Sequence, residues 1–344
     1  MAAKKSNFLR ILEDICREEG ISLDSFSYGW GHRLRKDGRT RYILGYQFPL
    51  NTASVKEFCQ DKVLTYQILD DSGIPAVEHV FLPHNIASTG LGEDDVDHIC
   101  RNMLALYGTV VVKDNNGTGG NKVFKAETME EIQQALAVIY AGNYGASISP
   151  YYDILEEYRV ILLDGEPLLV IRKDRAYVLD EEGKKQYLNW RHNLGQGARG
   201  VILEENEVPD GVRELAVSAA AVFGARFVSV DVVAVPSSGP SDHLRPAGEG
   251  MILPDKAGQT VPEGKDAGLS AEAGWTVTEG KDAGLSAEAE QTAPEKEGSE
   301  GTKLMVLEIN GGVMMEHLSG QSPEYYEKAK EVYRKAVLLS FEED

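Results

Sequence analysis

The stretch KLMVLEINGG, residues 303–312, says more about the fold than any other segment of its length. Its apolar residues 304–307 predict a buried strand, which delivers a carboxylate, Glu308, and two residues later an amide oxygen, Asn310. Side chains two residues apart lie on one face of a strand, and hard oxygen donors are the ligands that Mg2+ prefers. A strand-end magnesium site is one interpretation, and a solvent-exposed Glu and Asn is an equally good one for these two residues alone.

A second apolar stretch, FVSVDVV at residues 227–233, carries an acid in its middle. An ionised Asp231 inside an apolar strand is costly unless it is paired with, or bound to, a cation. This acid favours the metal hypothesis over the solvent-exposed interpretation.

Residues 237–302 separate these two stretches and differ from the rest of the chain. They hold 13 acidic and 5 basic residues, so −8 of the net charge of −20 lies there. The segment EGKDAGLSAEA at 263–273 recurs without change at 279–289. With so little apolar surface the segment is predicted to be disordered. If the flanking strands pair, it is a long insertion at the turn of a hairpin, which loop-closure entropy tolerates.

Composition excludes several classes of function. An isoelectric point near 4.8 argues against binding nucleic acid through its phosphates. No stretch is long and apolar enough for a membrane span, and no export signal precedes the first helix, so we expect a cytoplasmic protein with no membrane partner. The three cysteines, Cys16, Cys59 and Cys100, lie far apart without metal-ligand spacing, which predicts free buried thiols.

Periodicity predicts a mixed α/β chain. A capping box, Thr128 with Glu131, opens one helix, and Lys36-Asp37-Gly38 is a hairpin signal between two short strands. Helices are predicted over residues 6–19, 55–71, 94–107, 128–140, 211–223 and 324–341. Strands are predicted over residues 27–35, 41–47, 76–82, 109–113, 122–125, 147–151, 158–163, 168–172, 227–233 and 304–307.

A lysine ends the apolar strand in VVKDNNGTGG, residues 111–120, and a turn with three glycines follows it. Glycines let backbone N–H groups approach phosphate oxygens without a Cβ clash. The pattern is neither a Walker A motif nor a Rossmann fingerprint. A tight hairpin is the alternative, and Lys113 favours a phosphate clamp.

Further motifs complete a recognisable order: DK at 61–62 with LDDSGIP at 69–75, EYRV at 157–160, Arg172, RHN at 191–193, and Asp231 with Glu308-x-Asn310. Together with the glycine turn, they resemble ATP-grasp carboxylate–amine ligases of the ribosomal-protein glutamate ligase, cyanophycin synthetase and glutathione synthetase group. The resemblance implies an α/β (α+β) ATP-grasp fold, in which two α+β subdomains clasp ATP behind a short N-terminal region. It implies a short region at residues 1–53, an ATP-grasp domain at 54–236 and 303–344, and an insertion at 237–302.

The resemblance also implies a role for each matching residue. Lys62 and Lys113 are expected to contact the phosphates, with Gly117, Thr118, Gly119 and Gly120 closing over them. The adenine and the ribose are expected to contact Ser149, Pro150, Tyr151 and Glu157. Two Mg2+ (or Mn2+) ions are expected to bind Asp231, Glu308 and Asn310. The transferred phosphoryl group is steadied by Arg172, Arg191 and Asn193, with His192 beside them. Without the resemblance, Lys62 is a surface charge, Glu157 with Arg159 an exposed ion pair, and Arg191 with Trp190 a cation–π contact.

The implied function is an ATP- and Mg2+-dependent ligase that joins a carboxylate, from an amino acid or peptide, to an amine through an acyl phosphate. The region before the DK motif is short, and GGVMME at 311–316 departs from the family pattern, so the substrates stay open. An ATP-binding regulatory or scaffold module is the alternative, and a kinase or carboxylase of the same fold is a third. Such ligases are also compatible with a homo-oligomer.

Overall fold

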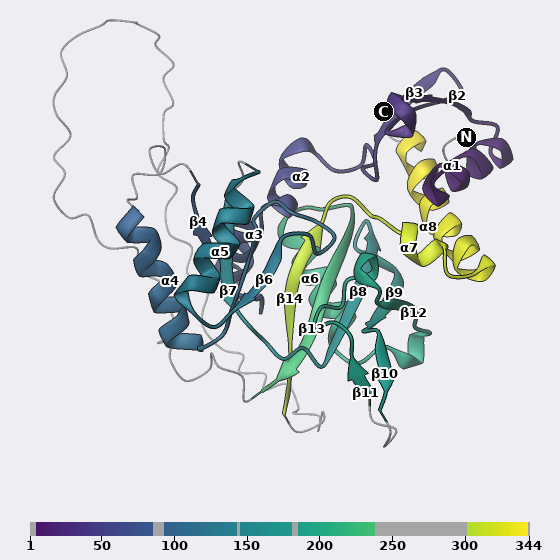
Figure 1. Cartoon of the computed structure of the whole chain (residues 1–344). Helices are drawn as coiled ribbons and strands as arrows, with labels where there is room; N and C mark the ends of the chain where they lie inside the picture. Colours follow the sequence, from purple (N-terminus) through teal and green to yellow (C-terminus); the bar gives the residue numbers. More distant parts are fainter. Residues whose placement is uncertain (1–4, 85–92, 143–144, 181–184, 238–300, 343–344) are drawn as a thin grey trace, which may run out of the picture. The chain divides into compact units, whose positions relative to one another are not determined.

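The computed structural model describes residues 5–84, 93–142, 145–180, 185–237 and 301–342, drawn in colour in Figure 1. The predicted disorder of the insertion concerns residues that lie, except at their ends, outside this range. Cys16, Cys59 and Cys100 are free and buried, as predicted. Across the described ranges, no helix combines the length and the apolar character that crossing a bilayer requires.

The centre of the fold is a five-stranded antiparallel sheet in the order β12-β9-β8-β13-β14. It consists of β8 (Glu156–Leu163), β9 (Glu166–Asp174), β12 (Arg199–Ile202), β13 (Phe227–Pro236) and β14 (Thr302–Asn310). The predicted strands on either side of the insertion therefore do pair. One face of the sheet packs under α6 (Val212–Val222), where valines of β13 and alanines of α6 share a core.

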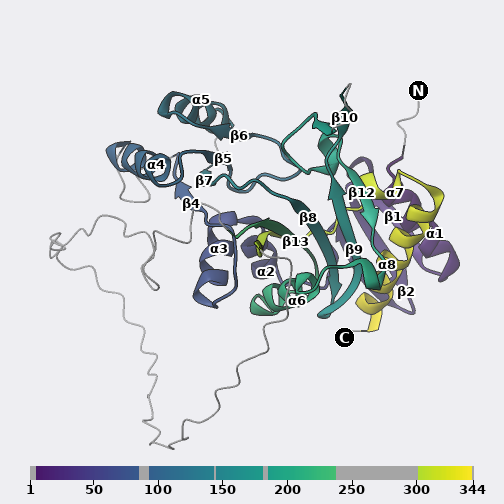
Figure 2. The same cartoon turned by 90° about the horizontal axis from the view of Figure 1, so that it is seen from below.

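A four-stranded sheet in the order β4-β7-β5-β6 carries the glycine turn. Its strands are β4 (Val80–Leu82), β5 (Val110–Asp114), β6 (Val123–Ala126) and β7 (Ala146–Pro150), and α4 (Glu93–Tyr107) and α5 (Met129–Tyr140) pack on it (Figure 2). The predicted capping box is present, because Thr128 Oγ1 accepts from Glu131 N and the Glu131 carboxylate accepts from Thr128 N. The strand predicted from residue 76 is shorter than expected, since only Val80–Leu82 pairs with β7.

The single helix predicted over residues 55–71 is wrong. The structure has two helices, α2 (Ala53–Gln60) and α3 (Lys62–Asp71), separated by Asp61. Asp61 adopts an extended backbone (φ −88°, ψ 110°), and its Oδ1 accepts from Leu64 N at 2.9 Å. A carboxylate at this position caps the second helix. The break places Lys62 in the first turn of α3 instead of the middle of a surface helix.

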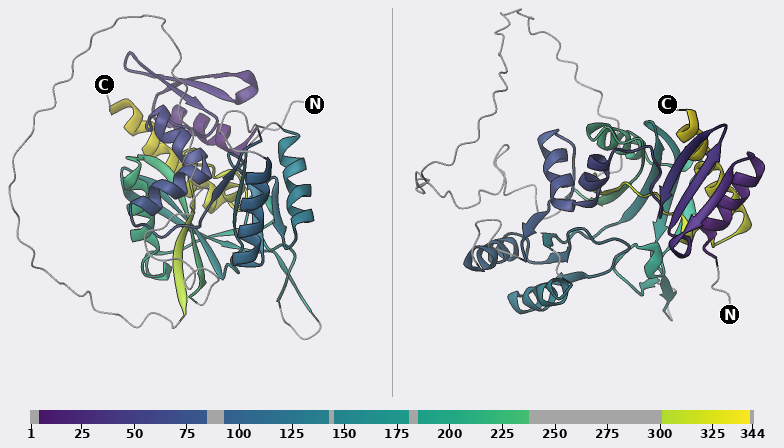
Figure 3. Two further views of the ribbon diagram at one scale, coloured as in Figure 1. Left: turned by 90° about the vertical axis from the view of Figure 1, so that its left-hand side faces the viewer. Right: turned by 90° about the horizontal axis from the view of Figure 1, so that it is seen from above.

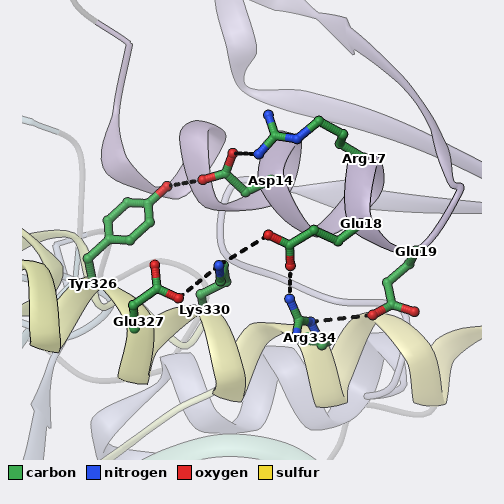
Figure 4. A network of polar contacts seen from close by, with 8 residues as sticks. All are labelled: Asp14, Arg17, Glu18, Glu19, Tyr326, Glu327, Lys330 and Arg334. Carbon is green, nitrogen blue, oxygen red and sulfur yellow. Dashed lines mark hydrogen bonds and ion pairs between the residues drawn. The ribbon is translucent and has the colours of Figure 1, made fainter.

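The N-terminal segment packs on the C-terminal helix. Helix α1 (Asn7–Glu18), capped by Ser6, lies against α8 (Pro323–Glu342), and they share a core with one end of the five-stranded sheet (Figures 1 and 3). Figure 4 shows polar contacts along this junction: Tyr326 donates to Asp14 at 2.8 Å, and Arg334 bridges Glu18 and Glu19. A three-stranded sheet, β1 (Ser22–Phe26), β2 (Gly31–Lys36) and β3 (Arg39–Leu44), completes this part.

Several short elements were not predicted. Besides β1 and β12, they are β10 (Tyr177–Leu179), β11 (Lys185–Tyr187), α7 (Glu316–Ser319) and the 3-10 turns η1 (Ser27–Gly29), η3 (Leu194–Gln196) and η4 (Glu205–Glu207). The first predicted strand began at residue 27, where the chain instead turns, with Ser27 and Tyr28 at positive φ.

Candidate active site

Two adjoining cavities, of about 450 Å³ and about 100 Å³, gather the predicted site residues. The smaller is lined by Lys62, Lys113, Gly117, Gly119, Gly120, Ser149, Pro150, Tyr151, Glu157, Arg191, His192, Asn193 and Glu308. The larger shares Lys62, Gly117, Gly119, Asn193 and Glu308 and adds Thr118 and Asn310. Asp231 and Arg172 line neither of these cavities. Most of the predicted set therefore meets in one place.

Glu308 and Asn310 lie together at the end of β14. Asp231 of β13 stands directly opposite Glu308 in the register, with a bulge next to this pair. Asn310 Nδ2 donates to Glu308 Oε1 at 3.3 Å. A carboxylate and an amide oxygen thus face the larger cavity side by side.

Asp231 is the centre of a buried group of four charges. Arg159 donates to it through Nε and Nη2, each at 2.8 Å, and Lys173 Nζ lies 2.8 Å from Oδ2. Lys173 also donates to Glu157 Oε1 at 2.5 Å. Burial by itself raises the pKa of Asp231, but the two cations outweigh it and hold that pKa well below its ordinary value. Two positive and two negative groups are therefore mutually compensated away from water.

The donor set fits a magnesium ion only in part. Glu308 and Asn310 supply oxygens that face the larger cavity, as a hard cation requires. The Asp231 carboxylate is fully buried and already accepts from both cations of its group. In the part of the chain that the structure describes, no three His, Cys, Asp or Glu side chains form a metal cluster.

Lys113, which is buried, and Lys62, which is half-buried, are cations of a different kind. Among the described residues, neither lies within ion-pair distance of a carboxylate. Lys62 Nζ donates to the carbonyl oxygens of Asn115 (3.1 Å) and Gly117 (2.6 Å), so it holds the start of the glycine turn. Burial, and next the neighbouring Lys62, lower the pKa of Lys113 from 10.5 to about 8. Glu308 attracts both lysines, and Asp114 also attracts Lys62, but neither acid forms an ion pair with them.

The glycine turn is held against the RHN segment. Arg191 Nη1 donates to the carbonyl oxygen of Gly120 at 2.7 Å. Gly120 has φ +74°, and a Cβ there would lie 2.5 Å from Asn193 Oδ1. Gly119 also has a positive φ, +69°, but a Cβ there would meet no atom within 4 Å. Gly120 is therefore required both by close packing and by backbone conformation, whereas Gly119 is required by backbone conformation alone.

The smaller cavity ends at β7 and at an aromatic pair. Tyr151 and Trp190 make an edge-to-face contact at 5.7 Å between ring centroids. His192 Nδ1 lies 2.9 Å from the Lys173 carbonyl oxygen, so this nitrogen carries the proton that it donates. His192 Nε2 is buried and has no partner among the described residues. This wall therefore offers an unused polar atom to a ligand.

Arg172 is not brought to this group. In β9 it stands opposite Tyr158, which belongs to the core under α6, and it pairs with Asp174 at 2.7 Å. The next residue, Lys173, points to the opposite face and takes part in the Asp231 group. Successive strand residues alternate between faces, so a shift of one position exchanges which cation faces the site.

Sequence reasoning missed the importance of Arg159 and Lys173, which both line the larger cavity. The signal was available: Asp231 needed a cation, and charged residues alternate with apolar ones in EYRV. His79 and His317 also line this cavity. Burial, and next Lys113, hold the pKa of His79 well below its ordinary value, so His79 is neutral.

Comparison with known proteins finds similarity to solved structures alone. No protein-family model and no curated protein sequence matches the chain. Among solved structures, it is similar to the ATP-grasp ligase PsnB complexed with a minimal precursor (12% identity, TM-score 0.43), over 83% of this chain and 63% of that one. It is also similar to D-alanine–D-alanine ligase from Bacillus anthracis (15%, TM-score 0.48), over 87% and 72%.

A bifunctional glutathione synthetase from Pasteurella multocida is a third such structure, at 14% identity and a TM-score of 0.42, over 66% of this chain and 36% of that one. The chain thus spans less than two thirds of PsnB and of this synthetase. The mixed α/β fold with antiparallel sheets is the fold class expected from the sequence. At such low identity, the activity of this chain has to be inferred from its own residues.

Proposed function

We propose that this chain is an ATP- and Mg2+-dependent ligase that joins a carboxylate to an amine through an acyl phosphate. One observation carries the proposal: two lysines, the half-buried Lys62 and the buried Lys113, share a cavity wall with Glu308 and form no ion pair with it. Cations shielded from water and without an ion-pair partner are stabilised when an anion completes the site. A polyphosphate with its metal ion is an anion of the right kind, because it brings negative charge to the lysines and a cation to the carboxylate.

Each part of the site has a role in this proposal. Lys62 and Lys113 bind phosphate oxygens, and the backbone N–H groups of the glycine turn close over them. The oxygens of Glu308 and Asn310 hold a metal ion, which neutralises charge on the phosphates when bound. The substrate carboxylate takes up the phosphoryl group, and the amine then displaces phosphate. The protein contributes position and charge neutralisation instead of covalent chemistry.

Exclusion of water is the second requirement, since an acyl phosphate hydrolyses. The contacts of Arg191 and Asn193 with Gly120 fasten the glycine turn to the opposite wall. We assign the catalytic unit to residues 54–236 and 303–344, which supply these groups.

A specific observation also supports an ATP-binding module without turnover. The Asp231 carboxylate is occupied by Arg159 and Lys173 instead of facing the cavity as a metal ligand. A site with fewer free metal donors binds nucleotide through its lysines but activates it less. This is the second candidate function.

Release of phosphate and ADP from Mg-ATP, with pools of amino acids and short peptides, separates the candidates. The ligase proposal requires release that depends on a pool and is abolished in Glu308→Gln. Glu205→Gln is the matched control, because Glu205 is a 94% exposed glutamate and lines neither cavity. Normal turnover in Glu308→Gln contradicts the ligase, whereas ATP binding without release from any pool supports the module.

A further inference from the structure

The three-stranded sheet of the N-terminal segment has one buried and one exposed face. His32, Leu34 and Ile43 point inward, where the core shared with α1 and α8 covers them. The exposed face carries large apolar side chains in place of the polar ones expected there. Together with the adjoining turn η1, we call it the aromatic face; its members are Phe26 (48% exposed), Tyr28, Trp30 (58%), Tyr42 (62%) and Leu44 (53%), with Arg33 and Arg35 between them.

This face also carries a surplus of positive charge. Arg33 and Arg35 outnumber Asp24 on this face, a net charge of +1 in a chain whose net charge is −20, whereas Arg39 and Arg41 turn to the other side and donate to carbonyl oxygens of α8. Arg33 and Arg35 share a single carboxylate oxygen, Asp24 Oδ2, at 2.8 and 3.0 Å. Two guanidinium groups on one carboxylate leave positive charge for a further anion.

The aromatic face continues into the candidate active site. Trp30 and Leu44, both more than half exposed, also line the larger cavity, and Tyr46 follows them inward. Glu308 and Asn310 line the same cavity. A chain lying on the sheet therefore adjoins the cavity that Glu308 and Asn310 line.

The aromatic face is also held firmly. The strands rest on the core formed with α1 and α8, and the polar contacts of Figure 4 join the two helices. Aromatic and arginine side chains on a rigid support are typical of protein interfaces, because they bury much area at low cost in conformational entropy. Contiguous exposed apolar surface of this kind marks an interaction site.

We propose that the aromatic face binds an acidic polypeptide that also carries apolar side chains, and that this polypeptide brings the reacting carboxylate to the cavity. This proposal rests on the proposed ligase function and names its substrate class. A flat sheet face suits several side chains of an extended peptide, whereas a free amino acid needs only the cavity. The excess of arginine over carboxylate selects the acidic composition.

The test compares two double variants by fluorescence anisotropy, without ATP. Phe26→Ser with Tyr42→Ser removes two exposed rings of the face, and Tyr177→Ser with Leu179→Ser is the control on β10, where both side chains are similarly exposed. The probes are two labelled pools of short peptides, one rich in Glu, Asp and Leu and one rich in Lys, Arg and Leu. We expect the wild-type chain and the control to prefer the acidic pool, and the first variant to bind it about tenfold more weakly.

Equal binding of the acidic pool by all three proteins overturns the proposal, and so does a preference for the basic pool. Self-association of the wild type that the first variant abolishes also overturns it, since a second copy then covers the face. Displacement of the peptides by single-stranded oligonucleotide does the same. Peptide binding without ATP turnover supports the face while contradicting the ligase. If free amino acids are turned over and the first variant binds the peptides as the wild type does, the ligase proposal stands and the proposal for the aromatic face is contradicted.

Discussion

Replacing Lys113 by methionine should make the protein more stable and unable to bind ATP. The side chain is 7% exposed and has no carboxylate within ion-pair distance among the described residues. Its pKa falls from 10.5 to about 8, mainly because burial disfavours the charged form. A difference of about 2.5 at 1.36 kcal/mol per unit corresponds to about 3 kcal/mol of destabilisation while the lysine is charged. Methionine keeps the length of the side chain and removes that cost.

The lowered pKa of Lys113 also determines how the stability of the wild type changes with pH. Below pH 8 the lysine is protonated in both the folded and the unfolded chain, so the whole cost is present. Between pH 8 and 10.5 the unfolded chain binds more protons, and the stability of the wild type rises with pH. Above 10.5 the lysine is neutral in both states and the cost is gone. The advantage of Lys113→Met is therefore largest at neutral pH and shrinks across this window.

Urea unfolding at a series of pH values measures this difference, because the other titrating groups are common to both proteins. Lys335→Met, which changes an exposed lysine on α8, is the control and should follow the wild type at every pH. Parallel curves for the wild type and Lys113→Met would show that Lys113 is not a destabilised buried cation. ATP binding should be lost in Lys113→Met even though its fold is more stable, the trade-off expected of a binding residue.

Three further substitutions test the site and its support. Asp231→Asn leaves two buried cations without their anion and should lower the free energy of urea unfolding by about 3–5 kcal/mol; a loss near zero contradicts the buried group. Gly120→Ala and Gly119→Ala should each cost about 1 kcal/mol of stability from positive φ, but only the first should raise the KM for ATP, through its clash with Asn193. Tyr333→Phe removes the hydroxyl that holds the chain after Asn310, and thermal unfolding should show a loss of about 1–3 kcal/mol.

Local patterns of sequence were reliable guides to the elements that they specify themselves. The capping box at Thr128 and the hairpin at Asp37-Gly38 depend on residues a few positions apart, and both are present. Both strands that flank the long insertion were predicted from their apolar residues, and the hairpin that the sequence left open is present, since β13 pairs with β14. Pattern and chemistry agreed at these positions, so sequence was sufficient.

Three features depended on information that no local pattern holds. The break at Asp61 interrupts an otherwise continuous helical period of apolar residues. It shows only in the structure, where the Asp61 side chain caps a second helix by accepting from Leu64 N. The face of β9 that Arg172 occupies depends on its register with β8, which shifts at a bulge after Ile161. Sequence could place a cation near this position but could not tell Arg172 from Lys173. Strand β1 is short and mostly exposed, so its residues lack the apolar alternation that predicts a strand.

The charges of the site divide into two groups with different consequences. Glu157, Arg159, Lys173 and Asp231 form the closed buried group, whose formal charges sum to zero and whose partners are already in place. Lys62, Lys113, Asp114 and Glu308 form an open group at the wall of the smaller cavity, whose formal charges also sum to zero but whose members make no ion pair with one another. The lysines can therefore bind an incoming phosphate, and the free oxygens of Glu308 and Asn310 can hold one metal ion there. A second metal ion that used Asp231 would have to displace Arg159, which donates to both carboxylate oxygens. Binding of a second ion would therefore cost the stability that the closed group provides.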